Sequence, residues 1–576
     1  MERNKFQFMK KLNKTLLKIG AAFTSGVMLF ALLSGCASSK TGAALSPEAA
    51  VTKLAPVART AEKPYEGVYY SIFVRSFADS NGDGIGDFNG ITKKLDYLND
   101  GNDSTTTDLG ITGIWLLPIF PSQSYHGYDV DDYYDVNPDY GTMEDFENLL
   151  AECKKRGISV IIDMTCNHSS TYTDWFQASR NPEDPHHSWY RWVTEDYERI
   201  DQKMWGHKVW NEDWKYKGNF YAGLFGSHMP DFNLDSPELR EEFKNVMKFW
   251  MDKGVSGFRY DAAGHVYNSA KTPAGTDSIK QGVEWWSELT SFNKSVNPDC
   301  YNVGEVWEAN SIRAQYIAGL GSNFHFFMGE RIVEALKQGV DGSNTLAAGL
   351  QGEYERLALS NPDYIDAPFL SNHDQARAAG LLKGDYDTCK AAASLYMLTE
   401  GVPFIYYGEE IAMKSGTDDP SKRTPMLWNV DVTNSSTGEV KPKDKLQTTW
   451  STSIYNKKTV PVAVQEKDPD SLLQYYKRLI RLRTAHSAFY RGRFTAVSVN
   501  NDAVSSWQMK DDAETAFVMV NVSTSPVTVS IPAEYATLIP VFYSHASASV
   551  SYDENGLMVT ATIPARGTVV ISTSLN

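Results

Sequence analysis

The chain has 576 residues, of which 42% are hydrophobic, 22% charged and 12% aromatic. This length accommodates several domain-sized units, and the composition excludes a disordered chain, a collagen-like chain and a multi-span membrane protein. With 55 Lys and Arg against 71 Asp and Glu the formal charge is −16, and because an acidic surface repels phosphate backbones we expect no nucleic-acid partner.

The first 35 residues predict an export signal. Basic side chains dominate residues 1–18, and the apolar run that follows ends in Leu33-Ser34-Gly35-Cys36. A basic segment, a short apolar core and small residues before a cleavage position are typical of a signal peptide. The ending resembles a bacterial lipobox, which implies that Cys36 becomes the lipidated first residue of an exported protein held at the membrane. An uncut N-terminal anchor is the alternative, and Met9 is an alternative start.

From Tyr65 onward, short β-rich runs alternate with amphipathic helical patterns such as Met143–Arg156 and Pro237–Lys253. Eight strands that alternate with helices predict a parallel (β/α)8 barrel, which we place at residues 63–489. The predicted strands are Tyr69–Val74, Gly113–Leu117, Ser159–Met164, Gly257–Asp261, Tyr301–Gly304, Phe324–Phe327, Ala367–Leu370 and Pro403–Tyr406.

Three segments differ from the barrel in composition. Residues 36–62 are rich in Ala, Ser, Thr and Pro without an apolar period, which indicates a flexible tether. Residues 168–235 form a gap between the third and fourth strands that is too long for an ordinary loop and is rich in Trp, which indicates an inserted subdomain. Residues 490–576 alternate Val, Thr and Ser with turn residues, which predicts an antiparallel β-sandwich.

The chain has five Cys, too few for a disulfide scaffold. Four of them come after Cys36 and lie in strand-like or helix-like patterns. We expect these four to be buried free thiols rather than disulfides; they are Cys153, Cys166, Cys300 and Cys389.

Polar side chains follow four of the predicted strands. In a parallel barrel the carboxyl ends of all strands meet at one mouth, so these side chains should converge there. A single Asp at a strand end is often a helix cap, but several acids, two His and an Arg together are hard to explain by capping. The segments are Asp163 to His168, Gly257 to His265, Val303 to Trp307 and Ser371 to Gln375.

These four segments resemble the signature regions of the α-amylase family, glycoside hydrolase family thirteen. The resemblance runs along nearly all of residues 65–576 and includes Gly401–Glu410 and Arg423–Trp428. Met229–Asn233 resembles the stretch that marks a group between oligo-1,6-glucosidases and neopullulanases, with Phe232 where Leu is usual.

The resemblance implies a role for each site residue. Asp261 is the expected nucleophile and Glu305 the general acid and then base, since retaining chemistry needs one ionised and one protonated carboxyl ~5–5.5 Å apart. Asp374 is expected to hold sugar hydroxyls and to favour the positively charged transition state. Arg259, two residues before Asp261 on the same strand face, can keep that carboxylate ionised. The expected substrate-binding residues are Tyr128, Asp129, His168, Arg259, His373 and Arg377.

The loop after the first strand reads Asp79-Ser-Asn81-Gly-Asp83-Gly-Ile85-Gly-Asp87. Alternating oxygen ligands with intervening Gly resemble the first part of an EF-hand-type calcium loop. We expect Ca²⁺ in a structural role, bound by Asp79, Asn81, Asp83, Asp87 and the carbonyl of Ile85. A plain Gly-rich turn is the alternative. A second calcium at Asn167, as in many α-amylases, stays open.

The expected substrate is starch or maltooligosaccharide, cut at internal α-1,4 bonds. An export signal suits an enzyme that cuts polymer too large to import, and His126 before Gly-Tyr-Asp resembles the α-amylases. Pairing of Asp129 with Arg377 across the mouth is the argument for the alternative, an exo-acting α-glucosidase, oligo-1,6-glucosidase or neopullulanase-type enzyme. A non-catalytic starch-binding lipoprotein is a remoter alternative, because all three expected acids are present. We expect a monomer.

Overall fold

The computed structural model describes residues 53–574, apart from 343–344, 533–537, 554 and 556–557. The predicted signal peptide, Cys36 and most of the predicted tether lie outside the described residues. Among the described residues, no helix combines the length and the apolar character that crossing a membrane requires.

Eight parallel strands form one sheet in the order β12-β11-β10-β9-β3-β2-β1-β13. A parallel bridge joins Phe404 of the outer strand β13 to Phe369, two residues after the other outer strand β12, so the sheet closes into a barrel. This confirms the predicted (β/α)8 fold. The strands are β1 (Tyr69–Ile72), β2 (Gly113–Leu116), β3 (Ser159–Met164), β9 (Gly257–Tyr260), β10 (Tyr301–Gly304), β11 (Ser322–Phe324), β12 (Ile365–Ala367) and β13 (Phe404–Tyr406).

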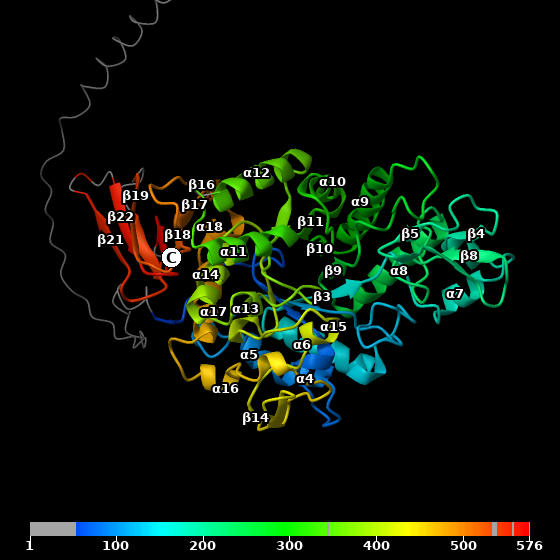
Figure 1. Cartoon of the computed structure of the whole chain (residues 1–576), viewed down its shortest axis with the longest axis horizontal. Coiled ribbons are helices and arrows are strands. Elements are labelled where there is room, and N and C mark those ends of the chain that lie inside the picture. The colour runs from blue at the N-terminus through cyan, green and yellow to red at the C-terminus, as the bar shows by residue number, and fades with distance from the viewer. Residues whose placement is uncertain (1–52, 343–344, 533–537, 554, 556–557, 575–576) are drawn as a thin grey trace, which may run out of the picture. The chain divides into compact units, whose positions relative to one another are not determined.

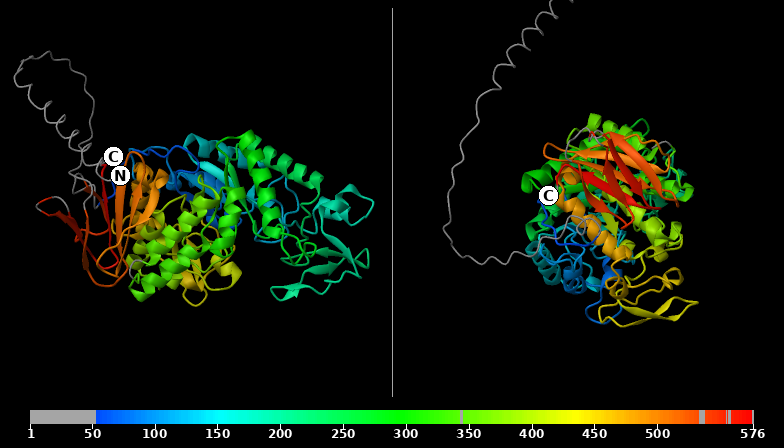
Figure 2. Two further views of the ribbon diagram at one scale, coloured as in Figure 1. Left: turned by 90° about the horizontal axis from the view of Figure 1, so that it is seen from above. Right: turned by 90° about the vertical axis from the view of Figure 1, so that its left-hand side faces the viewer.

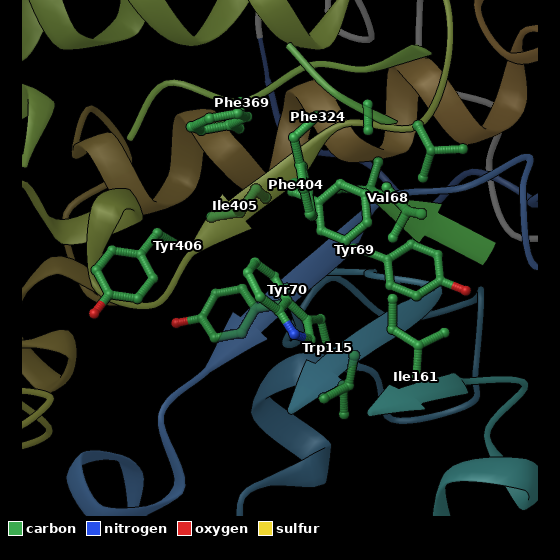
Figure 3. Close-up of a cluster of buried hydrophobic side chains, with 14 of the residues drawn as sticks. Val68, Tyr69, Tyr70, Trp115, Ile161, Phe324, Phe369, Phe404, Ile405 and Tyr406 are labelled. Carbon is green, nitrogen blue, oxygen red and sulfur yellow. The ribbon is translucent and has the colours of Figure 1, made fainter. Parts of the chain in front are cut away.

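Aromatic rings fill the interior of the barrel (Figure 3). The ring centroid of Phe404 lies 5.0 Å from that of Tyr69 and 4.9 Å from that of Phe324, whose ring lies 5.2 Å from that of Trp115. All four side chains are buried. Because large apolar rings from different strands meet at the axis, the barrel is a packed core, and chemistry is confined to its mouth.

Helices surround the sheet (Figure 1). A capping box in which Thr142 and Asp145 bond reciprocally begins α6 (Met143–Lys155). Ser236 caps α8 (Pro237–Lys253), which ends at Gly254 in a left-handed conformation with φ 110°. The other long helices are α9 (Ser278–Val296), α10 (Asn310–Leu320), α11 (Phe326–Gln338), α12 (Thr345–Ser360), α14 (Tyr386–Met397) and α17 (Leu472–Ala485).

Three predicted strands differ from the observed ones by more than one residue at a boundary. The sixth strand, predicted at Phe324–Phe327, occupies Ser322–Phe324, and Phe326 already begins α11, so the apolar run combines a strand end with a first helical turn. The seventh, predicted at Ala367–Leu370, ends at Ala367 because Pro368 has no amide hydrogen to donate. The first gives way to a short helix, α3 (Val74–Phe77).

The segment between β3 and α8 forms small antiparallel sheets around an aromatic core. Trp205 and Gly206 make the two-residue turn between β5 and β6, with φ 48° and φ 91°. A left-handed conformation costs a non-glycine residue about 1–3 kcal/mol. The elements are α7 (Asp174–Ser179), β4 (Trp192–Thr194), β5 (Lys203–Met204), β6 (His207–Lys208), β7 (Trp210–Glu212) and β8 (Asn219–Ala222).

Two antiparallel sheets follow α18 (Ser487–Arg491) and share one apolar core (Figure 2, orange and red strands). Phe517 and Val569 of the first sheet pack with Val529 and Ala561 of the second. The first sheet contains β16 (Arg493–Ala496), β17 (Val504–Lys510), β18 (Thr515–Asn521), β23 (Thr568–Ser572) and β20 (Ile539–Tyr543), and the second β19 (Val527–Pro532), β22 (Met558–Ile563) and β21 (Ser549–Tyr552).

The four described cysteines are free and buried, which confirms the prediction for them. Burial raises the pKa of the Cys153 thiol to about 12, so this side chain is an inert core residue.

Candidate active site

Arg259, in strand β9, is the centre of the polar network at the barrel mouth. Its Nη1 donates to Asp163 at 2.6 Å and to Asp261 at 2.8 Å, and its Nη2 donates to Glu305 at 2.5 Å. The guanidinium has almost no exposed surface, and its planar fork holds the carboxyl groups of three neighbouring strands in fixed places. Asp261 and Glu305 therefore accept from the two terminal nitrogens of one guanidinium, which brings together at the barrel mouth the two carboxyl groups that a retaining mechanism uses.

Asp261 and Glu305 differ in acidity. Burial raises the pKa of Asp261 to about 6, against the opposing effect of Arg259. Burial also raises the pKa of Glu305 to about 8, and the nearby charges of Asp261 and Asp374 act in the same direction. At pH 7 the first carboxyl is mostly ionised and the second mostly protonated, which are the states of a nucleophile and a general acid.

Asp374 is the third acid of the site. One of its oxygens accepts from Arg423 Nη2 at 3.0 Å, and the other lies 3.1 Å from Nε2 of His373. Burial acts to raise its pKa, but the His373 ring and the Arg423 guanidinium outweigh burial and lower it. The carboxylate therefore stays ionised beside the positions where a cationic transition state would form.

Three aromatic side chains lie beside these acids, and two of them, Tyr128 and His168, line the pocket. The ring of Tyr128 lies 5.5 Å from that of His373 and almost parallel to it, and its hydroxyl donates to Asp163 at 3.1 Å. His373 is buried and is held between Tyr128 and Asp374. His168 lines the pocket, and its buried Nε2 has no hydrogen-bond partner within the described residues, so it is available to a sugar hydroxyl. Burial lowers the pKa of His168 to about 3, so the ring is neutral.

Asp129 and Arg377 do not form the pair that the exo-acting alternative would use. Asp129 accepts from the hydroxyls of Ser122 and Ser124, at 2.7 Å for Ser122. Nη1 of Arg377 donates to the carbonyl of Tyr407 at 2.6 Å. Both side chains are buried, and in the part of the chain that the structure describes no hydrogen bond or ion pair joins them. The arginine that the sequence interpretation placed at the mouth thus donates to the carbonyls of Tyr407 and Lys422, and its buried Nη2 has no hydrogen-bond partner among the described residues.

A pocket of about 520 Å³ opens over these groups, and Asp261, Glu305 and Asp374 all line it. Arg423 and Trp205 also line it, although the sequence interpretation singled out neither as a site residue. Arg423 lies in a segment that the sequence analysis singled out, but its partner Asp374 is 49 positions away. The remaining lining residues include His126, Tyr128, His168, Phe225, His265 and Trp307.

The ammonium group of Lys271 lies beside Asn167, where a second calcium site was left open. Nζ of Lys271 donates to Oδ1 of Asn167 at 2.7 Å and lies 3.6 Å from Oδ1 of Asp231. Nδ2 of Asn167 donates to the same oxygen of Asp231 at 2.9 Å, and all three side chains are buried. A cation of the protein itself therefore neutralises Asp231, which leaves no need for a bound metal here.

The loop from Asp79 to Asp87 is folded around its own carboxylates. Asp79 accepts from the amides of Asn81, Gly82 and Gly84, and Asp83 accepts from the amide of Ile85. Asp87 accepts from Ser80 and from Gly90, where it caps α4 (Phe88–Lys93). No group of three or more His, Cys, Asp or Glu side chains gathers as a metal site within the described residues. The oxygen-rich donor set still suits a hard cation, because each carboxylate oxygen has a second lone pair.

A (β/α)8 barrel whose mouth pairs an ionised carboxylate with a protonated carboxyl on one guanidinium defines a glycoside hydrolase. The model of the α-amylase catalytic domain matches residues 71–492. The chain therefore belongs to the α-amylase family and is a retaining glycoside hydrolase that acts on α-glucans.

Individual relatives differ in activity. The chain is 39% identical to "Alpha-amylase 3" of Dictyoglomus thermophilum over 79% of this chain and 84% of that protein. It is 30% identical to a 4-alpha-glucanotransferase of Thermotoga maritima over 79% of this chain and 95% of that protein. The crystal structure of an α-amylase from H. orenii superposes with a TM-score of 0.78 at 37% identity, covering 88% of this chain and 99% of that one.

Proposed function

We propose that this enzyme cleaves internal α-1,4 bonds of starch and maltodextrins, as an α-amylase does. The observation that carries the proposal is the separate engagement of Asp129 and Arg377, because the pair that the exo-acting alternative would use to close the pocket behind a single sugar does not form among the described residues. Similarity to two α-amylases supports the same assignment.

The reaction takes place in two steps, and each site residue has a role in them. In the first, Glu305 gives its proton to the glycosidic oxygen while Asp261 attacks the anomeric carbon, and the sugar leaving group departs. In the second, Glu305 takes a proton from water, and the resulting oxygen displaces Asp261 from the anomeric carbon. Asp374, ionised beside Arg423, stabilises the positive charge of both transition states.

Viscosity and reducing ends of soluble starch, followed together, test the mode of attack. Internal cuts make viscosity collapse while few reducing ends appear. Reducing sugar that rises while viscosity holds would instead assign exo-attack, the alternative of the α-glucosidase and oligo-1,6-glucosidase type. The Asp261→Asn variant is the control for the chemistry, since undiminished turnover in this variant would remove the assignment of Asp261 as the nucleophile.

We further propose that the loop from Asp79 to Asp87 binds Ca²⁺ in a structural role. The residues that would hold the ion are Asp79, Asn81, Asp83, Asp87 and the carbonyl of Ile85, and the ion would stiffen the loop after β1. Chelation should lower the melting temperature, and excess Ca²⁺ should restore it. An unchanged melt of protein with no metal by elemental analysis would contradict the proposal.

We also propose export and lipid attachment at Cys36. Its support is the sequence alone, a basic segment and apolar run that end in Leu33-Ser34-Gly35-Cys36. Mass spectrometry of the protein purified from membranes should find a diacylglyceryl group on Cys36, and Cys36→Ser should release the chain from the membrane fraction. A chain that keeps residues 1–35 would favour the uncut anchor.

A further inference from the structure

The side-chain amide of Asn167 is held in one orientation by two buried charged groups. Its Oδ1 accepts from Nζ of Lys271 at 2.7 Å, and its Nδ2 donates to Oδ1 of Asp231 at 2.9 Å. The reversed amide would place its N–H groups against the ammonium and its oxygen against the carboxylate, so both contacts would become repulsive. All three side chains are buried, so bulk water does not relieve such a mismatch. The orientation of the amide is therefore fixed.

The second N–H of the same amide is directed to the ring of His168. Nδ2 of Asn167 lies 3.1 Å from Nδ1 of His168. An amide nitrogen only donates, so Nδ1 must accept with its lone pair. Burial lowers the pKa of His168 to about 3, the charge of Lys271 acts in the same direction, and the carbonyl of Tyr128 opposes both. The ring is therefore neutral at pH 7, and because a neutral imidazole carries one proton, that proton is on Nε2.

Nε2 is the ring nitrogen of His168 that is left for a ligand. It is buried and has no hydrogen-bond partner among the described residues, and the side chain lines the pocket together with Asp261. As an N–H donor it bonds to an oxygen of the sugar, which leaves the hydrogen of that hydroxyl free to donate to a carboxylate. The opposite tautomer would present a lone pair and would compete with the carboxylates for this hydrogen. The position of the ring proton therefore decides how the sugar is held.

We propose that the Asn167 amide fixes the tautomer of His168, with the ring proton on Nε2, where it donates to the substrate. Lys271 and Asp231 are then positioning residues, which act on the ring through that amide. Asn167, Lys271 and Asp231 are not among the residues that line the pocket, so they set the direction of a hydrogen bond in a site that they do not touch. The inference rests on the proposed function, because it assigns the ring a bond to the α-glucan.

Nitrogen NMR of the free enzyme tests the tautomer directly. In the full chain, labelled on its histidine nitrogens and measured at pH 7, we expect a protonated Nε2 and an unprotonated Nδ1 for His168. The His168→Gln variant identifies these signals by their absence. In Asn167→Asp, a carboxylate oxygen replaces the amide nitrogen that faces Nδ1, so Nδ1 should become protonated.

Asn293→Asp is the matched control for the spectra. Asn293 is a buried amide in α9 whose Nδ2 donates to Tyr260 and Asn302 instead of a histidine, so its replacement should leave the His168 signals unchanged. A protonated Nδ1 in the wild-type protein would overturn the proposal, and this spectrum needs no variant to fold other than the one that identifies the signals. An Nδ1 that stays unprotonated in Asn167→Asp would overturn it as well.

A double-mutant cycle tests whether the tautomer matters for catalysis. Asn167→Asp should lower kcat/KM on maltooligosaccharides about 10–100-fold. A glutamine side chain presents an amide N–H and has no tautomer, so in the His168→Gln background the same change should cost less than about threefold. Equal losses in the two backgrounds would show that Asn167 only maintains the structure, and would overturn the positioning role. A wild-type enzyme that hydrolyses no α-glucan would overturn the proposed function, whereas the spectra would still decide the tautomer.

Discussion

Nη1 of Arg259 lies 2.6 Å from Oδ1 of Asp163, a carboxylate with no exposed surface at the end of β3. This ion pair fixes the position of the guanidinium, so that its remaining hydrogen bonds are directed to Asp261 and Glu305. Burial raises the pKa of Asp163 to about 6 against the opposing effect of Arg259. Asp163 is thus a positioning residue that acts on the reacting carboxyls through Arg259.

Asp163→Asn should lower kcat about 10–100-fold, because it weakens the contact that orients Arg259 against the reacting carboxyl groups. The amide keeps an oxygen for Arg259 but lacks the negative charge. Because that charge raises the pKa of Asp261, the acidic limb of the pH–rate profile should move to lower pH. Asp363→Asn, on an exposed turn, is the control. A loss of kcat with an unmoved acidic limb would indicate a purely structural role.

The pH dependence of the wild-type enzyme should be bell-shaped with its maximum near pH 7. Activity falls below about pH 6 because Asp261 is protonated and cannot attack, and it falls above about pH 8 because Glu305 has lost the proton that it donates. The measurement is kcat/KM on maltooligosaccharides, which reports on the pair in the free enzyme.

A control substrate separates the two limbs of this profile. α-Maltosyl fluoride needs little proton donation in the first step, so the alkaline limb of its fluoride release should be weaker. A profile for maltooligosaccharides that rises steadily up to pH 10 would contradict the assignment of Glu305 as the acid.

Lys271→Met should destabilise the protein strongly. The change leaves Asp231 as a buried carboxylate without its cation and Asn167 without its donor, a loss of about 3–5 kcal/mol for a broken buried pair. We expect a melting temperature at least ~5 °C lower. Lys208→Met is the matched control, since Lys208 forms only an exposed ion pair with Asp201 in the described chain. Equal melting temperatures for the two variants would show that the buried ammonium is dispensable.

Local sequence patterns predicted most of the barrel strands and the position of three acids at the strand ends. Alternation of strands and helices, together with acids at strand ends, predicted β3 and β10 with their observed bounds, because each strand is a buried apolar run with a distinct end. The family resemblance placed Asp261, Glu305 and Asp374 at one pocket, where the structure also has them.

What the sequence did not predict depends on contacts between distant residues. Lys271 lies in a loop 104 positions after Asn167, and no local pattern links the two. The pair of Asp129 and Arg377, which the exo-acting alternative would use, does not form, and Arg377 donates instead to the carbonyls of Tyr407 and Lys422. Sequence spacing does not indicate which partner a distant side chain binds, because the packing of loops at the barrel mouth determines it.

Two adjacent buried acids follow β13 and should make stability depend on pH. Oε1 of Glu409 accepts from Tyr396 at 2.8 Å and from Tyr476 at 2.9 Å, and its buried Oε2 has no hydrogen-bond partner among the described residues. Burial raises the pKa of Glu409 to about 8, although the two tyrosines act to lower it. Burial raises the pKa of Glu410 as well.

The folded state therefore holds a proton on Glu409 between about pH 4.5 and 8, where the unfolded chain has released it. Below about pH 4.5 the proton on Glu409 imposes no free-energy difference against the unfolded chain, and the stability is at its full value. As the pH rises to about 8, the free energy of unfolding decreases, so the melting temperature should fall over this range. In Glu409→Gln, which cannot ionise, the fall between pH 5 and pH 9 should be smaller by several degrees than in wild type. Glu195→Gln, at an exposed position, should follow wild type. If Glu409→Gln also follows wild type, then Glu409 is ionised in the folded protein already at pH 5.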